Sequence, residues 1–381
     1  MPTAGRIKVL HTIRQGKIGG GETHVLDLVS NLSDDFESEV LAFTDGEMVR
    51  ELKSRGILCH VIYTEKPFDF RVWSQVRNLM ISRNIDVVHA HGTRACSNSF
   101  WAANKENLPL LYTIHGWSFH QDQSPVVRNV REFSERFLVR RTNLNISVSQ
   151  SNNNDGIQRI GMPNSTVVNY GVNTEKFDPY TAPRLTRGDL SLPDDKVIVG
   201  MLARLTIQKD PVTFVKAAGK VLEKTDKVHF LLVGGGELED DCRREVSNLG
   251  IGEHITFQAF RTDVPEVLKL MDIYCLPSLW EGLPIGILEA MAMEKAIVAT
   301  PVDGTKEVIR HEISGMLFPE YQYAQMAECI LKLAGDGELR QKLGNEARRI
   351  IDESFGVDRM ALEIGDLYKN LLTERKQLFA S

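Results

Sequence analysis

Residues 273–300 have the sequence IYCLPSLWEGLPIGILEAMAMEKAIVAT, and this stretch decides the fold class. A short apolar run at 273–276 precedes a polar loop, then a helical pattern that starts near Pro284, then a second β-branched run at 297–300. A strand, a helix and a second strand in this order are typical of a parallel sheet with crossover helices. The stretch therefore predicts an α/β protein.

The same alternation continues outward in both directions as two series. The strands expected in the first series are 7–13, 40–43, 59–63, 87–90, 110–114, 144–148 and 167–170. The strands expected in the second series are 197–203, 228–233, 255–260, 273–276 and 297–300. Residues 174–195, which contain Pro179, Pro183 and Pro193, interrupt the pattern and indicate an interdomain connection.

The length of 381 residues exceeds one ordinary core, because domains usually hold about 100–200 residues. We predict two Rossmann-like, doubly wound domains, residues 1–173 and 174–356, that face a cleft. The tail 357–381 has one long helical pattern and is expected to cross back onto the first domain.

Composition excludes some classes of function. Hydrophobic residues make up 42% and charged residues 25%, as in ordinary soluble proteins. Residues 1–173 hold 19 Lys and Arg against 17 Asp and Glu, whereas residues 174–381 hold 26 against 34. This balance argues against nucleic acid as a partner, but a mildly basic first half leaves room for an anionic membrane surface or acceptor.

The cysteines and the termini bear on the cellular compartment. The five cysteines are scattered and form no Cys-x-x-Cys pair, so neither a disulfide framework nor a zinc site is indicated. No apolar run approaches the roughly 20 residues that cross a bilayer, and the N-terminus does not resemble a signal peptide. We expect a cytoplasmic protein that could contact the inner face of the membrane only peripherally.

Ligands of open parallel sheets bind beyond the carboxyl ends of the strands, and two cations follow such an end here. Arg204 ends the strand 197–203, and Lys209 follows just before the helix start at Asp210-Pro211. A guanidinium and an ammonium at this place could neutralise the two phosphates of a nucleotide diphosphate. The alternative is a pair of solvated surface cations.

The loop and helix after residues 273–276 carry the strongest signal. Glu281 and Gly282 lie in the loop, and Glu289 lies in the early turns of the helix. At the helix start the backbone N–H groups of residues 283–286 would be free and could hold phosphate oxygens. Pro284 has no N–H, so the donors are those of Leu283, Ile285 and Gly286. One carboxylate could then accept from sugar hydroxyls and the other from ribose hydroxyls. Complementing the helix dipole would explain only one of the two.

The first expected strand is followed by the glycine-rich sequence GKIGGGET at residues 16–23, at the start of a helix. Gly19, Gly20 and Gly21 would let backbone N–H groups approach a phosphate or a sugar. The cluster lacks the spacing of a dinucleotide fold or a P-loop, so a flexible turn is the alternative.

Three histidines in the first half are candidates for a site. His115 follows the strand 110–114 and precedes a glycine, which favours a functional role over a structural one. His89 and His91 alternate on one strand face and could form a metal site with His115. No carboxylate with ligand spacing accompanies them, so we expect no metal.

These elements together resemble the retaining GT-B glycosyltransferases of family 4, the glycosyl transferases group 1. The resemblance rests on Arg204-x4-Lys209, on Glu281-x7-Glu289 and on the glycines at 19–21, and it spans nearly the whole chain. It implies that Arg204 and Lys209 contact the donor diphosphate, and that Glu289 holds the ribose. It also implies that Glu281, with Gly282, Leu283, Pro284 and Ile285, contacts the transferred sugar, which His115 faces.

The resemblance further implies a hexose-type sugar, a nucleotide-sugar donor, most simply a UDP-sugar, and retention of anomeric configuration. The segment from Phe260 to Val264 is expected to border the base, without identifying it. Where family members carry Asn-Gly-Val-Asp this chain has Asn169-Tyr170-Gly171-Val172-Asn173, which weakens the match at the hinge. No Asp-x-Asp occurs, so we expect neither a metal nor another cofactor.

The acceptor stays open as a glycan, a lipid-linked sugar or a small molecule. A GT-B fold can also host a nucleotide-sugar epimerase, or a non-catalytic nucleotide-sugar-binding subunit. Residues 125–141 combine an apolar stripe with arginines, and such a helix could lie on anionic lipid. A helix with one face packed on its own sheet has the same pattern. The stripe consists of Val126, Val130, Phe133 and Phe137.

Overall fold

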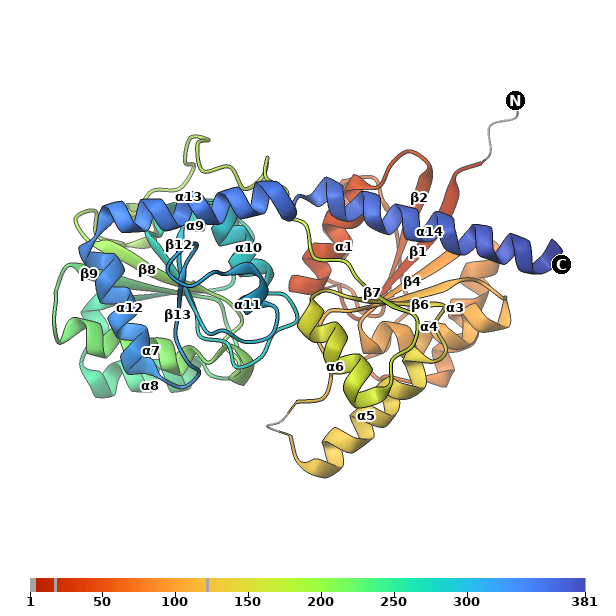
Figure 1. Cartoon of the computed structure of the whole chain (residues 1–381), viewed down its shortest axis with the longest axis horizontal. Helices are drawn as coiled ribbons and strands as arrows, with labels where there is room; N and C mark the ends of the chain where they lie inside the picture. The colour runs from red at the N-terminus through yellow and green to blue at the C-terminus, as the bar shows by residue number, and fades with distance from the viewer. Residues whose placement is uncertain (1–4, 17–18, 121–122, 381) are drawn as a thin grey trace. The chain divides into compact units, whose positions relative to one another are not determined.

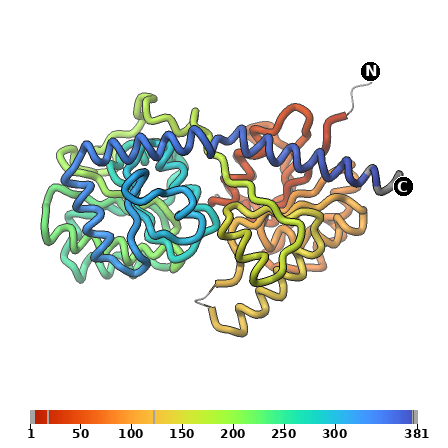
Figure 2. The backbone as a smooth tube through the Cα atoms, in the orientation of Figure 1, coloured from red at the N-terminus to blue at the C-terminus, as the bar shows by residue number. Residues whose placement is uncertain are grey.

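The computed structural model describes residues 5–16, 19–120 and 123–380. The chain forms two compact units (Figures 1 and 2). Unit 1 takes in the chain up to Gly171 and again from Val357, and unit 2 runs from Val172 to Gly356. The last helix, α14 (Val357–Ala380), therefore belongs to unit 1 although unit 2 precedes it in the sequence. This return of the C-terminal helix is as predicted.

Unit 1 is built on a seven-stranded sheet in the order β3-β2-β1-β4-β5-β6-β7. Every strand pair is parallel. The strands are β1 (Ile7–Ile13), β2 (Phe36–Ala42), β3 (Leu58–Val61), β4 (Val87–His91), β5 (Leu110–Ile114), β6 (Leu144–Ser147) and β7 (Ser165–Val167). β2 begins four residues before the expected strand, because Glu37, Ser38 and Glu39 hide its start from a search for apolar runs.

Helices cover both faces of this sheet, and in Figure 1 α14 (dark blue) lies beside α1 (red). One apolar core joins the sheet to α3, α4 and α5, and another joins it to α1 and α14. The helices of unit 1 before α14 are α1 (Gly20–Asn31), α2 (Glu47–Ser54), α3 (Phe70–Ser82), α4 (Thr93–Lys105), α5 (Pro125–Val139) and α6 (Gln150–Ile160). Doubly wound packing of this kind buries the β-branched strands on both faces.

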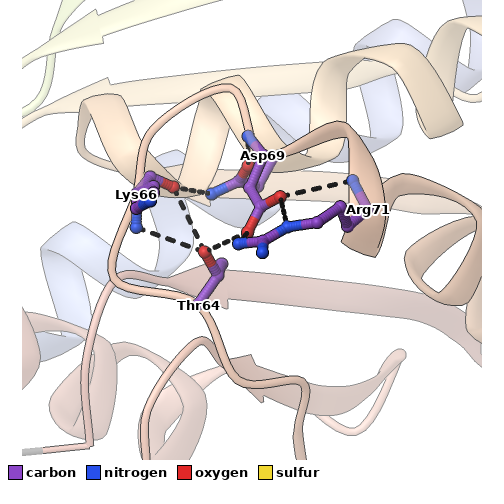
Figure 3. A network of polar contacts seen from close by, with 5 residues as sticks. Thr64, Lys66, Asp69 and Arg71 are labelled. Atoms are coloured by element: carbon purple, nitrogen blue, oxygen red, sulfur yellow. Dashed lines mark hydrogen bonds and ion pairs between the residues drawn. The ribbon is translucent and has the colours of Figure 1, made fainter.

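The start of α3 illustrates how a polar network fixes a helix end (Figure 3). The Asp69 carboxylate accepts from the Arg71 backbone N–H at 3.3 Å, from Arg71 Nε at 2.7 Å and from Thr64 Oγ1 at 2.8 Å. Hydrogen bonds from Arg71 and Thr64 hold the pKa of Asp69 well below its usual range. The side chain thus caps the helix as an ionised group and ties it to the loop after β3.

Unit 2 is built on a six-stranded parallel sheet in the order β10-β9-β8-β11-β12-β13. The strands are β8 (Val197–Leu202), β9 (Val228–Val233), β10 (Ile255–Gln258), β11 (Ile273–Leu276), β12 (Ala296–Ala299) and β13 (Met316–Leu317). The helices are α7 (Pro211–Leu222), α8 (Glu239–Leu249), α9 (Val264–Leu270), α10 (Ile285–Ala292), α11 (Thr305–Val308), α12 (Tyr323–Gly335) and α13 (Gly337–Ser354). The 3₁₀ turns are η1 (Gly188–Leu190), η2 (Ile207–Lys209) and η3 (Gly252–His254).

The strand order of unit 2 reverses between β8 and β11. The chain moves from β8 outward to β9 and β10, and then returns to place β11 on the other side of β8. At such a switch point the loops after the two strands diverge and leave room for a ligand beyond their carboxyl ends. The sequence-predicted cations follow β8, and the loop with Glu281 follows β11.

Candidate active site

The structure brings Lys209 and Glu281 into direct contact at this switch point. Lys209 Nζ forms an ion pair with Glu281 Oε1, and both side chains are largely buried. Ser278 Oγ donates to the same carboxylate oxygen at 2.6 Å. An ammonium and a carboxylate that have lost most of their water are costly unless they are paired. The arrangement therefore holds one fixed cation and one fixed acceptor at the edge of the unit 2 sheet.

The loop that carries Glu281 is held from two sides by residues that the sequence analysis did not identify. Gln208 Nε2 donates to the Trp280 carbonyl at 2.9 Å, and the Glu281 backbone N–H donates to Asp303 Oδ2 at 2.8 Å. Gly304 lies so close that a Cβ there would be 2.2 Å from the Gly282 carbonyl oxygen. The Asp303-Gly304 pair, in the loop after β12, is the turn signal that could have marked this contact.

Helix α10 begins where the sequence predicts, with Pro284 as its N-cap and Ile285 as its first residue. The first N–H groups of a helix have no intrahelical acceptor, so they form an anion-binding end beside Glu281. Glu289, on the second turn, is 8% exposed. Burial, together with the charges of Glu289 and Glu281, raises the pKa of Tyr274 well above its usual value. Tyr274 is therefore a neutral donor, and its hydroxyl bonds to the Leu202 carbonyl at 3.1 Å.

Arg204 lies on the exposed loop after β8, and among residues 5–16, 19–120 and 123–380 its guanidinium has no ion-pair partner. Two glycines shape the turn around it. Gly234 has φ +138°, and a Cβ there would be 2.0 Å from the Ala203 carbonyl oxygen. At Gly236 the Cβ would be 2.3 Å from the Leu205 carbonyl oxygen. The loop after β9 therefore packs directly on the backbone that presents Arg204.

The segment predicted to border the base lies after β10, which β9 separates from β8. Phe260 is exposed, and Val264 is the first residue of α9. Between them, Arg261 Nε donates to Asp263 Oδ1 at 2.8 Å. This segment is thus at the same edge of the sheet as Lys209 and Glu281, but one strand lies between β10 and β8, which Lys209 follows, and two strands lie between β10 and β11, which Glu281 follows.

The glycine cluster and His115 come together in unit 1. Gly19 is the N-cap of α1, and Gly20 and Gly21 are its first residues, whereas Lys17 and Ile18 lie outside the described residues. A Cβ on Gly21 would be 3.3 Å from His115 Cδ2. His115 Nδ1 is 2.6 Å from the Tyr170 hydroxyl. Tyr170, noted in the sequence only as a departure from the family pattern, thus contacts a predicted site residue.

His115 is half-buried and lies beside four buried histidines, His11, His24, His89 and His91. Loss of hydration lowers the pKa of His115 well below 6.5, and the nearby His24 and Arg14 lower it further. Burial lowers the pKa values of His11 and His24 to about 3. The same cause lowers those of His89 and His91 well below 6.5. All five imidazoles are therefore neutral near pH 7.

Among the described residues, His11, His89 and His91 have ring nitrogens within 4.8 Å of one another, and His115 is not in this group. His89 Nδ1 is 2.6 Å from the Tyr368 hydroxyl, and His89 Nε2 is 2.7 Å from Thr113 Oγ1. Three histidines can hold zinc elsewhere, but here both ring nitrogens of His89 are engaged by hydroxyl groups and none is left to ligate an ion. The donor set therefore fits a metal poorly, and His11 was not recognised because it lies 78 residues before His89.

Comparison with known proteins defines the class. The crystal structure of HepE from Anabaena in complex with UDP and glucose matches 96% of this chain and 100% of that chain, with a TM-score of 0.86 and 22% identity. This likeness and the two parallel-sheet α/β units establish the GT-B fold. The model of Glycosyltransferase Family 4 matches residues 18–176, and that of Glycosyl transferases group 1 matches residues 184–350. The chain belongs to this family of GT-B glycosyltransferases, as the motifs predict.

Two similar curated proteins are named for the sugar acceptors that they use. The UDP-Gal:alpha-D-GlcNAc-diphosphoundecaprenol alpha-1,3-galactosyltransferase of Escherichia coli is 26% identical over 319 residues, which are 81% of either chain. The N,N'-diacetylbacillosaminyl-diphospho-undecaprenol alpha-1,3-N-acetylgalactosaminyltransferase of Campylobacter jejuni is 28% identical over 277 residues, 69% of this chain and 72% of that protein. Both names describe sugar transfer to a lipid-linked diphosphate sugar.

Proposed function

We propose that the protein is a retaining glycosyltransferase that moves a hexose-type sugar from a UDP-sugar to a sugar carried on a lipid diphosphate. The contact between Lys209 and Glu281 at the switch point of unit 2 carries the proposal. Family membership supports transfer from a nucleotide sugar. The printed names of both relatives support the lipid-linked acceptor, and the HepE complex and the galactosyltransferase name support UDP.

In this proposal the diphosphate binds beyond β8 and β11. Lys209 supplies a point charge and Arg204 a planar fork, so that together they balance the negative charge that builds up on the departing diphosphate. The first N–H groups of α10 add donors with no cost of reorientation. Arg204 is suited to this task because it is exposed and has no ion pair to break among the described residues.

Glu281 then acts on the sugar and Glu289 on the ribose. When the ammonium of Lys209 moves to a phosphate oxygen, the Glu281 carboxylate is left facing the donor and accepts from sugar hydroxyls. After Lys209 has moved, Ser278 Oγ still donates to Oε1 at 2.6 Å, and Gln208 Nε2 lies 3.5 Å from Oε2, so both carboxylate oxygens stay crowded by donors. Such crowding lowers nucleophilicity, so we favour front-face substitution, in which the leaving phosphate assists the acceptor hydroxyl.

The proposal needs no metal, because side chains and a helix end meet the diphosphate charge. Neither relative is an epimerase, so the comparisons give that alternative no support. The non-catalytic alternative would leave the Lys209–Glu281 pair without a task beyond binding. It predicts UDP binding without turnover.

The test has two arms. Thermal shift with UDP, GDP and ADP at equal concentration should single out UDP, because a ligand of the folded state raises the melting temperature more when it binds more tightly. UDP-galactose and UDP-glucose are then incubated with a short-chain lipid diphosphate that carries N-acetylglucosamine, with and without EDTA. UDP release that depends on the acceptor and persists in EDTA is expected. UDP release in the absence of acceptor, or an isomerised donor, would contradict transfer.

A further inference from the structure

Helix α5 has two apolar faces, and only one of them packs against unit 1. The inner face comprises Leu138 and Val139, both fully buried. The outer face carries Val126, Val130 and Phe133, which are 74%, 60% and 68% exposed. At about 100° per residue, positions 126, 130 and 133 lie within one narrow sector, roughly opposite position 139. The interpretation that this stripe packs on the sheet is therefore wrong, except for Phe137 at its inner end.

The charges around this outer face are almost all positive. Residues 125–141 contain five arginines and two glutamates. Glu132 is ion-paired with Arg159 at 2.7 Å, and burial raises the pKa of Glu135. Neither glutamate therefore offsets the exposed guanidiniums. The arginines are Arg128, Arg131, Arg136, Arg140 and Arg141. At about 100° per residue, Arg136, Arg140 and Arg141 flank the outer face, whereas Arg128 and Arg131 lie on the opposite side of the helix.

The inner end of α5 is fastened to the loop that follows His115. Ser118 Oγ donates to Glu135 Oε1 at 2.6 Å, and Tyr112 OH donates to Glu135 Oε2 at 2.9 Å. Arg131 Nη1 donates to the Ser118 carbonyl at 2.6 Å. Figure 1 draws the start of α5 at the outer margin of unit 1, away from the sheet. The exposed half is thus held rigidly to the part of unit 1 that contains His115.

From these observations we infer that the outer face of α5 is the surface by which the protein docks on an anionic lipid membrane. Exposed apolar side chains flanked by arginines match the boundary between acyl chains and negatively charged headgroups. A soluble acidic partner would not require the valines and the phenylalanine, and a second copy of the chain would set arginine against arginine. The inference rests on the proposed function for the reason to dock, namely an acceptor on a lipid.

Vesicle flotation tests the inference directly. The probes are phosphatidylcholine vesicles with and without about 30% phosphatidylglycerol. Wild-type protein should float with the anionic vesicles and much less with the neutral ones, and raising the salt should weaken binding because it screens the guanidiniums. The double variant Val130→Ser/Phe133→Ser should bind the anionic vesicles about tenfold or more weakly. Replacing Arg136 and Arg140 by Gln should weaken binding about fivefold per arginine.

Phe70→Ser provides the matched control. Phe70 is the first residue of α3 in the same unit, and it is 74% exposed. It follows Asp69 of the network in Figure 3. The substitution therefore removes an exposed phenylalanine from a different surface. It should bind vesicles as wild type does. Equal flotation of wild type and the Val130→Ser/Phe133→Ser variant would overturn the inference. So would a change from dimer to monomer in light scattering with vesicle binding unaltered, because the face would then join two copies.

UDP binding, measured by calorimetry on the same variants, separates this inference from the proposed function. The residues proposed to hold UDP lie in unit 2, whereas α5 lies in unit 1, so UDP affinity should be unchanged. Vesicle binding without UDP binding would refute the proposed function and leave the docking surface standing. UDP binding without vesicle binding would do the opposite.

Discussion

The strands next to the two predicted sites differ in the polar groups that they carry. In unit 1, His11, His89 and His91 lie within the strands themselves and are fully buried. In unit 2, strands β8, β11 and β12 bury almost only apolar side chains, and the charged Lys209 and Glu281 lie in the loops beyond them. A polar group inside a strand loses all its water, whereas a group in a loop keeps part of it and can stay ionised.

This difference separates two kinds of chemistry. The neutral imidazoles of unit 1 can exchange hydrogen bonds with hydroxyls, as His89 does with Tyr368 and Thr113. The charged loops of unit 2 suit an anion such as a diphosphate. Among the described residues, no helix is both long enough and apolar enough to cross a bilayer. Four predictions can break or sharpen the comparison.

Acidification should produce the largest effect, and it should act on unit 1. The pKa values of His11 and His24 are about 3 in the folded state against 6.5 in the unfolded chain. The unfolded state therefore binds more protons, so the stability is fully present above pH 6.5 and is lost as pH falls toward 3. At pH 5 the loss is about 2 kcal/mol for each ring. Calorimetry between pH 7 and 5 measures it.

Unit 2 and one substitution serve as controls for this prediction. Unit 2 contains the buried His229, whose pKa is lowered only to about 4, so its stability should respond less. In His24→Phe, an aromatic ring that cannot titrate replaces one whose two nitrogens lack partners among the described residues. This variant should recover about 2 kcal/mol at pH 5 relative to wild type. A pH response equal to that of wild type would show that His24 is not buried as a neutral ring.

Removing the cation of the unit 2 site should reduce activity, and it should also lower stability because Glu281 loses its ion-pair partner. In Lys209→Ala, kcat/KM for transfer should fall about 10²- to 10³-fold, as for other groups that stabilise charge on a leaving group. Steady-state kinetics of UDP release give the value. Lys220→Ala is the matched control, because Lys220 is also ion-paired but exposed, with Glu223 at 2.7 Å. Equal activity of the two variants would refute the assigned role of Lys209.

The elements around this pair could be predicted from the sequence because each has a local signal. Asp210-Pro211 predicts the start of α7, and the Asp210 side chain indeed accepts from the Thr213 N–H. The apolar run at 273–276 predicts β11 to the residue. The contact with Asp303 and Gly304 could not be predicted, because it joins loops 22 residues apart whose approach depends on how β11 and β12 are paired.

Substituting Gly304 should have an intermediate effect on stability and on UDP affinity, because the new side chain would displace the loop that carries Glu281. Gly304→Ala places a methyl group against the Gly282 carbonyl, which must move, and we expect unit 2 to lose about 1–3 kcal/mol. UDP affinity should fall with it, because the displaced backbone holds Glu281. Gly252→Ala is the control, since a Cβ there meets nothing within 4 Å. Chemical unfolding and calorimetry with UDP check both expectations, and an unaltered UDP affinity would show that the loop adapts.

The site in unit 1 was less accessible to sequence analysis than that in unit 2. His115 and the glycines could be identified from their places after strands, but nothing local connects them with His24 or Tyr170. Helix α5 was ambiguous for a different reason, since a helix that is apolar on two opposite faces gives no preference for which face packs. In both cases the sequence does not show which distant side chains pack together in the folded protein.

Tyr170→Phe should give the smallest effect, and it tests whether His115 acts through a hydrogen bond. The change removes only the hydroxyl 2.6 Å from His115 Nδ1, so the ring loses the partner that fixes its tautomer and orientation. We expect transfer to slow about five- to tenfold, about the free energy of one hydrogen bond, with UDP affinity unchanged. Tyr63→Phe, at an exposed tyrosine of the same unit, should be silent.

The pH profile of that variant carries the comparison further. If His115 donates or accepts as a neutral ring, wild type and Tyr170→Phe should both transfer without a histidine titration between pH 6 and 8, because the pKa of His115 lies well below 6.5. A step in the rate near pH 6.5 in the variant alone would mean that the Tyr170 contact keeps water from the ring. A step in both would mean that the ring is solvated when substrate binds, and the contrast between a neutral unit 1 and a charged unit 2 would then fail.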